Sequence, residues 1–112
     1  SFLFSIVWTI LYVLMGISSY LVNNSDAPKE EIKRANLVYA ISLFFNFFWS
    51  IIFFNARAFF FAFIWLVLLW VAIVVNIFFF YKVNKTAGKL LIPYLIWVTF
   101  AGYLNFGIYL LN

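Results

Sequence analysis

Four long stretches without a single charged side chain follow one another along this chain, with only short interruptions between them. They cover residues 2–22, 35–54, 58–81 and 90–111. About 20 apolar residues are enough for a helix to cross the hydrocarbon core of a bilayer, and a helix satisfies its own backbone hydrogen bonds there. A soluble domain of 112 residues that is 69% hydrophobic and 9% charged would leave much of its apolar surface in water. We therefore expect an all-α, polytopic membrane helix bundle that forms a single transmembrane domain over residues 1–112.

The residues that the chain lacks exclude several kinds of site. It contains no cysteine and no histidine, so thiolate and imidazole metal ligands are missing and disulfides cannot form. We expect no metal site, no required cofactor and no conventional catalytic residue, because no nucleophile–base pair or phosphate-binding loop is recognisable. A small four-helix multidrug transporter is a weak alternative. A proton-coupled antiporter needs an ionisable residue inside the membrane, whereas all three acidic residues lie in segment 23–34.

Basic residues predict how the bundle is oriented. Segments 23–34 and 82–89 are expected to be loops on the same side of the membrane, with Gly88 as a helix stop. Together they hold six of the seven basic residues, and only Arg57 belongs to the other side. Because loops rich in lysine and arginine stay in the cytoplasm, we expect both loops to be cytoplasmic. The net charge of +4 is explained in this way and gives no reason to expect nucleic-acid binding.

Aromatic and small polar side chains gather on one face of each of three spans. At about 100° per residue, one stripe forms on the first span, one on the second and one on the last. A helix surrounded by lipid gains nothing from such a stripe unless it faces protein or a ligand. Two interpretations stay open: an interhelical hydrogen-bonding seam, or a seam that also lines a pocket. Trp8 has a further one, an anchor at the membrane interface. The stripe residues that we take as candidate ligand contacts are Trp8, Tyr12, Asn46, Trp49, Ser50, Tyr94, Trp97, Ala101 and Asn105.

Three sequence blocks resemble a known family. They read WTILYVLMG (8–16), NFFWSIIFF (46–54) and PYLIWVTFAGYLN (93–105). In this order they are similar to the signature blocks of the tryptophan-rich sensory proteins, the bacterial relatives of the mitochondrial translocator protein, once called the peripheral benzodiazepine receptor. The resemblance implies a five-helix bundle, usually a homodimer, in a bacterial cell membrane. The four spans would be its helices two to five, so we expect further sequence before Ser1.

The resemblance also implies a function. Family members bind tetrapyrroles such as protoporphyrin IX, and some bind sterols or benzodiazepine-like drugs. We therefore expect a receptor-like membrane protein that takes porphyrin, or a similar flat hydrophobic ligand, into an aromatic-lined pocket for tetrapyrrole sensing or transport. The alternative is a light-dependent porphyrin-degrading enzyme, in which Trp8 and Trp97 act as redox partners of the excited porphyrin.

Some positions of this sequence match the family's pocket residues, and others differ from them. Trp8 and Trp97 match the two tryptophans that face the porphyrin, and Tyr12, Asn46, Trp49, Ser50 and Ala101 match other pocket positions. Two positions depart from the pattern. Ser42 stands where many members have glutamine, and no basic residue follows Tyr109, so the sterol-type motif is incomplete.

Overall fold

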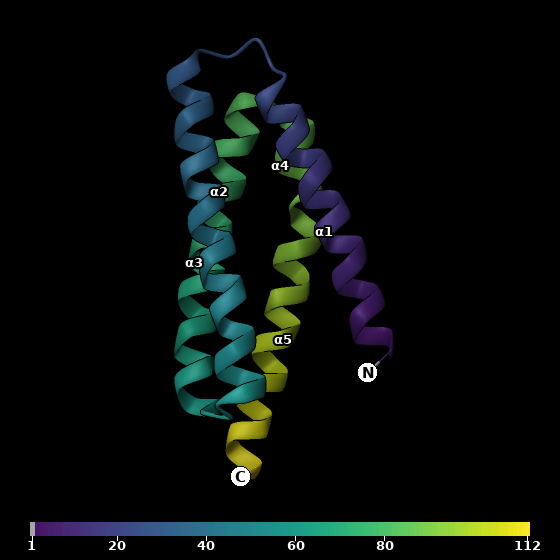
Figure 1. Ribbon diagram of the computed structural model, residues 1–112, viewed down its shortest axis with the longest axis vertical. Coiled ribbons are helices and arrows are strands. Elements are labelled where there is room, and N and C mark those ends of the chain that lie inside the picture. Colours follow the sequence, from purple (N-terminus) through teal and green to yellow (C-terminus); the bar gives the residue numbers. More distant parts are fainter. Residues whose placement is uncertain (1) are drawn as a thin grey trace.

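The computed structural model describes residues 2–112 and is built from helices (Figure 1). Four segments are long and apolar enough to cross a membrane, and no strand occurs in the part of the chain described. The all-α prediction is confirmed, and each predicted span corresponds to one of these segments. The elements are α1 (Phe2–Asn23), α2 (Lys29–Ser50), the π-helix η1 (Ile51–Asn55), α3 (Phe59–Val83), α4 (Lys85–Leu90) and α5 (Ile92–Leu111).

The helices run up and down along the 50 Å long axis of the molecule (Figure 1). α2 packs beside α3, and α3 packs beside α5. α1 is held to α4 near its C-terminal end, where the Ser18 hydroxyl donates to the Ala87 carbonyl over 2.7 Å. From there α1 leans away from α2 and α3 toward its N-terminal end. The helix is thus tied down at one end of the bundle and packed more loosely at the other.

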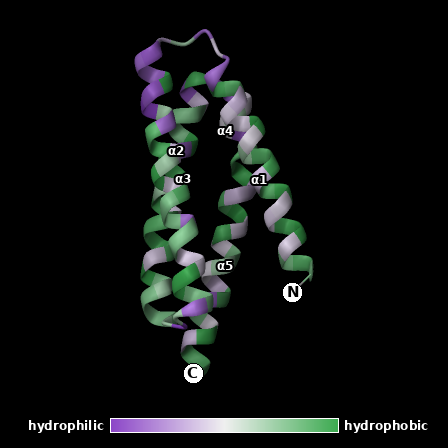
Figure 2. Ribbon diagram, in the orientation of Figure 1, coloured by the Kyte–Doolittle hydropathy of each residue, from purple (hydrophilic) through white to green (hydrophobic). Residues whose placement is uncertain are grey.

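The surface between the two ends of the bundle is apolar. Figure 2 shows hydrophilic residues gathered where α1 joins α2, with a short hydrophilic segment at the opposite end, where α2 joins α3. Large apolar side chains between these ends are exposed, with Leu37, Phe47 and Ile96 each more than 60% accessible. Such a surface is unfavourable in water and compatible with lipid. The structure therefore describes an integral membrane protein.

The second span begins earlier than its apolar stretch. We predicted 35–54, but α2 starts at Lys29. Pro28 stands at the N-cap, and Glu30 and Glu31 lie in the first turn, where their charges favour the positive end of the helix dipole. This charged first turn continues the helix beyond its apolar part, so hydropathy alone places its start too late.

The prediction that residues 82–89 form a loop is wrong. Asn84 alone separates α3 from α4, and its side chain accepts a 3.0 Å hydrogen bond from the Ala87 amide, which caps α4. Gly88 does not stop a helix but lies inside α4. A Cβ atom at Gly88 would lie 2.6 Å from Cβ of Tyr81, so glycine is what allows α4 to pack against the end of α3.

α4 and α5 are separated only at Leu91, so they form one interrupted span. Pro93 follows in the first turn of α5. Its ring nitrogen has no hydrogen to donate to the preceding turn, which explains why the α-helix is interrupted here. Both basic segments lie at the same end of the bundle, because the α1–α2 connection and α4 are neighbours (Figure 1).

The turn between α2 and α3 has an unusual backbone. η1 widens the last turn of the second span, and the Ala56 amide donates to the Ile51 carbonyl five residues back, over 3.1 Å. Arg57 then adopts a left-handed backbone with φ of 54°. This short connection makes α2 and α3 antiparallel neighbours, as its length predicts.

Candidate ligand-binding site

A chain of hydrogen bonds through Asn46 joins three helices. The Tyr12 hydroxyl of α1 donates to Oδ1 of Asn46 over 3.0 Å, and Nδ2 of Asn46 donates to the Tyr94 hydroxyl of α5 over 2.7 Å. Asn46 and Tyr94 are almost fully buried, whereas Tyr12 is 48% exposed. An amide that is buried without partners is costly, and here both of its polar atoms are bonded. The seam predicted from the stripes therefore exists.

A second polar contact lies one turn further along α2. Nε1 of Trp49 donates to Oδ1 of Asn105 over 3.2 Å. Nδ2 of Asn105 donates in turn to the Phe59 carbonyl over 2.8 Å, at the start of α3. Asn105 is fully buried and Trp49 nearly so. This contact fixes the Trp49 indole against α5.

An aromatic cluster fills the space between α1 and α5. The rings of Trp8 and Trp97 meet edge to face, with centroids 6.4 Å apart. Trp8 also lies 6.4 Å from the Tyr94 ring, and Phe4 lies 5.4 Å from the Trp97 ring. Nε1 of Trp97 is buried and has no hydrogen-bond partner among the described residues. A buried N–H donor without an acceptor is unfavourable, so an acceptor group at this place would be stabilised.

A cavity of about 230 Å³ adjoins the cluster. Ala101 and the buried indole of Trp49 form part of its wall. Small-molecule sites usually measure about 300–1,000 Å³, so a large flat ligand requires α1 or the aromatic rings to move. Its lining residues are Phe4, Trp49, Phe53, Phe54, Ala101, Leu104 and Ile108.

A groove of about 520 Å³ runs between α1 and α5 and reaches the same cluster from outside. Trp97 and Phe100 line it from α5, and Pro93 lies at its start. The groove gives a ligand in the lipid phase a route to the Trp97 indole along the loosely packed half of α1. The residues of α1 that line it are Val7, Ile10, Leu11 and Leu14.

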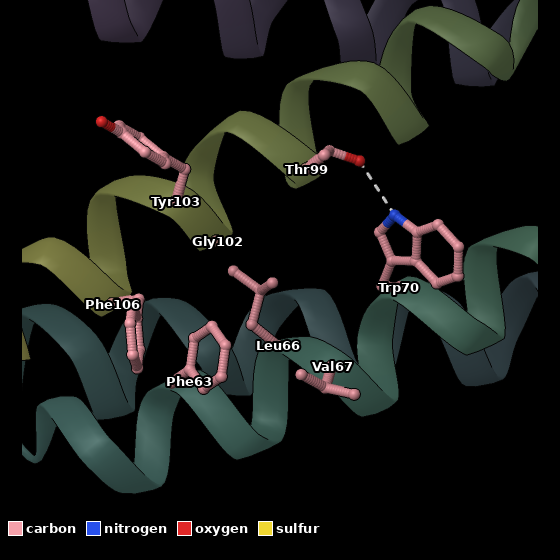
Figure 3. Close-up of a pocket in the computed structure, with 8 residues that line it drawn as sticks. All are labelled: Phe63, Leu66, Val67, Trp70, Thr99, Gly102, Tyr103 and Phe106. Atoms are coloured by element: carbon pink, nitrogen blue, oxygen red, sulfur yellow. Dashed lines mark hydrogen bonds between the residues drawn. The ribbon is translucent and has the colours of Figure 1, made fainter.

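The opposite side of α5 carries a different groove, of about 390 Å³, against α3 (Figure 3). Nε1 of Trp70 donates to the Thr99 hydroxyl across it over 2.9 Å. Leu66 points toward Gly102, where a Cβ atom would lie 3.0 Å from the leucine methyl group. Trp70 is thus a hydrogen-bonded tryptophan outside the aromatic cluster.

The structure brings most of the predicted site residues together, but in different roles. Tyr12, Asn46 and Tyr94 form the seam, and Trp8 and Trp97 lie in the aromatic cluster. Only Trp49 and Ala101 line the 230 Å³ cavity, while Asn105 holds Trp49 in place. Ser50 is half-buried at the end of α2 and is not part of the cavity wall.

Sequence reasoning missed several residues of the cavity wall. Phe4 precedes Trp8 by one helical turn, so the stripe on α1 could have been extended to it. Phe54 could not be found from helical periodicity, because η1 widens the turn and brings both Phe53 and Phe54 to the cavity. No group of metal-ligating side chains occurs within residues 2–112.

Four membrane-crossing helices that enclose a hydrogen-bonded seam and an aromatic cluster define a polytopic integral membrane protein with a candidate interior ligand site. Residues 1–111 match the TspO/MBR family, and the chain belongs to this family.

Named relatives agree with this assignment. The tryptophan-rich protein TspO of Chlorobaculum tepidum is 42% identical over 110 residues, which cover 98% of this chain and 70% of that protein. The tryptophan-rich protein TspO of Archaeoglobus fulgidus is 37% identical over 112 residues, covering all of this chain and 71% of its own length. The human translocator protein is 37% identical over 101 residues, which are 89% of this chain and 60% of the human protein.

Proposed function

We propose that this protein binds protoporphyrin IX, or a similar flat hydrophobic ligand, among the aromatic residues between α1, α2 and α5. The observation that carries the proposal is the buried N–H group of Trp97, which lacks an acceptor inside a cluster of aromatic rings. Aromatic rings from two helices offer faces and edges to a flat π-system, and the indole N–H offers a hydrogen bond to a polar atom of the ligand.

The loose packing of α1 near its N-terminal end would allow a ligand to reach the aromatic cluster. The helix is fastened to α4 through Ser18 and to α2 through the Tyr12–Asn46 hydrogen bond, and nearer its N-terminal end it contacts the bundle through the rings of Phe4 and Trp8. Rings that meet edge to face can be displaced by a ligand that offers equivalent aromatic contacts. The α1–α5 groove of about 520 Å³ is the entry route in this proposal.

The test is titration of the purified protein with protoporphyrin IX while tryptophan fluorescence is followed. We expect saturable quenching in the wild type. Trp97→Phe should weaken binding, because the N–H donor is lost while most of the apolar surface is kept. Trp70→Phe is the matched control, since Trp70 lies on the other side of α5 with Thr99 as its acceptor. Absence of saturable quenching in the wild type would refute porphyrin binding.

Contact between Trp8 and Trp97 favours a second candidate function. Two oxidisable indoles with ring centroids 6.4 Å apart allow an electron vacancy to be shared beside a bound porphyrin. In this second proposal the indole pair supplies the redox partner of an excited porphyrin. The illumination experiment in the Discussion separates it from binding alone.

Membrane orientation and assembly belong to the same proposal. We propose that the end of the bundle with six of the seven basic residues faces the cytoplasm of a bacterial cell membrane. We also propose a homodimer, as the family resemblance implies. Light scattering of the protein in a detergent of known micelle mass tests the dimer, and a monomeric mass at all protein concentrations contradicts it.

A further inference from the structure

One cationic residue lines a space of mixed polar and aromatic character at the end of the bundle where α2 meets α3. Arg57 lines a space of about 310 Å³ together with Phe53, Phe54, Phe59, Ile108 and Asn112. Phe53, Phe54 and Ile108 also line the 230 Å³ cavity of the candidate site. The two spaces therefore adjoin, with the rings of η1 between them. A ligand that displaces these rings occupies a volume typical of small-molecule sites and reaches the guanidinium group.

No acidic side chain at this end neutralises Arg57. The three acidic residues of the chain lie between residues 26 and 31, at the opposite end of the bundle (Figure 1). The other six basic residues also belong to that end. Arg57 is thus a single positive charge at the edge of an apolar region. Arg57 is exposed, so solvent screens its charge until a ligand with an apolar body covers it, and its attraction for an anionic group of that ligand then becomes stronger.

The backbone conformation of Arg57 also suggests a role for this residue. Its φ of 54° lies in the left-handed region, which glycine and asparagine occupy more readily than a residue with a long side chain. A strained residue that is not glycine at such a turn suggests that its side chain has a role. Ala56 before it has a helical backbone, whereas Ala58 after it does not, with φ of −86° and ψ of 77°; Arg57 is the residue of this turn that has a positive φ.

We propose that Arg57 binds the carboxylate of an amphiphilic ligand whose flat apolar body lies against Trp49, Phe53 and Phe54. This inference rests on the proposed function and narrows its ligand class to planar molecules with an anionic edge. Protoporphyrin IX fits that description because both of its propionates lie on one side of the ring. Guanidinium and carboxylate form paired, charge-assisted hydrogen bonds, which orient the ligand as well as hold it.

The experiment compares protoporphyrin IX with its dimethyl ester, in which the ring is unchanged and the carboxylates are neutral. Both are titrated into the full chain in an uncharged detergent, with tryptophan fluorescence as the readout. In the wild type the acid should bind at least about tenfold more tightly than the ester. Arg57→Gln should remove this preference by weakening the acid about tenfold and leaving the ester unchanged. Arg57→Lys should keep part of it.

Two controls separate a binding role from a structural one. Lys82→Gln removes a charge at the opposite end of the bundle and should leave the acid–ester preference intact. Arg57→Gly removes the same charge as Arg57→Gln but relaxes the backbone, so it should lose the preference while its Tm stays the same or rises.

The outcomes distinguish the two proposals. If neither porphyrin binds the wild type, the proposed function fails. If both bind the wild type equally well, or if Arg57→Gly weakens the acid and the ester to the same extent, porphyrin binding stands and the role of Arg57 is refuted. An acid–ester preference that disappears in both Arg57→Gln and Arg57→Gly supports the inference.

Discussion

Nδ2 of Asn46 donates a hydrogen bond of 2.7 Å to the Tyr94 hydroxyl, and this bond joins α2 to α5 in the buried centre of the bundle. The same amide accepts from Tyr12 of α1, so one side chain connects three of the four spans. In hydrocarbon no water replaces such partners. The bond therefore specifies how the helices are arranged as well as stabilising them.

Asn46→Leu should leave the protein in the membrane but lower its stability by about 0.6–2 kcal/mol, the range measured for interhelical hydrogen bonds in membrane proteins. The physical reason is that the buried Tyr94 hydroxyl loses its partner. Thermal denaturation in detergent measures the effect. Phe47→Leu is the control, because Phe47 follows Asn46 and is 61% exposed on the outer face. Equal Tm values for the two variants would show that the Asn46 bonds contribute nothing.

Gly88→Ala should destabilise the protein by about 1–3 kcal/mol, as overpacking does in other cores. The new methyl group would meet Cβ of Tyr81 at 2.6 Å and its Cα at 2.7 Å, and backbone cannot move aside as a flexible side chain does. Gly107→Ala is the matched control, because no atom outside the adjacent residues and the backbone of its own helix lies within 4 Å of the corresponding position. That variant should be neutral or stabilised by up to about 1 kcal/mol. A fall in Tm for Gly107→Ala alone would contradict the close packing of α4 on α3.

Single cysteines report the orientation directly, because the natural chain has none. Asn24→Cys and Thr86→Cys place a thiol at the basic end, and Ala56→Cys places one at the α2–α3 turn; all three positions are exposed. With an impermeant maleimide added outside intact cells, only Ala56→Cys should react. Reaction of Asn24→Cys or Thr86→Cys from outside would reverse the proposed orientation.

Illumination separates ligand binding from chemistry. If the protein is a light-dependent enzyme, the absorption band of porphyrin bound at a saturating protein concentration should decay in the wild type and persist in Trp8→Phe and Trp97→Phe, because phenylalanine is much harder to oxidise than indole. Absorption spectra recorded over time in the light and in the dark provide the measurement, and Trp70→Phe should behave as the wild type. A stable band in the illuminated wild type would refute the enzymatic reading and leave binding as the function.

The sequence alone determined that this protein lies in lipid and which side chains occupy the inner faces of its helices. Four uncharged stretches require lipid, because neither their length nor their composition can be buried in a domain of this size. The 3.6-residue period of a helix is set by backbone geometry alone. Asn46, Trp49, Tyr94 and Asn105 could therefore be assigned to inner faces before their partners were known.

Only the tertiary structure decided which of these residues touch and which segments depart from a regular helix. Trp8 of α1 and Trp97 of α5 are in contact, and the placement of α1 that allows this depends on contacts between residues far apart in the sequence, such as Ser18 and Ala87. Gly88 permits a close approach that exists only once α4 folds back against Tyr81. η1 brings Phe54 to the cavity and leaves Arg57 in a left-handed turn, whereas the regular period used to read the sequence assumes that no such deviation occurs. Long-range packing fixes these details, and local sequence periodicity contains no information about it.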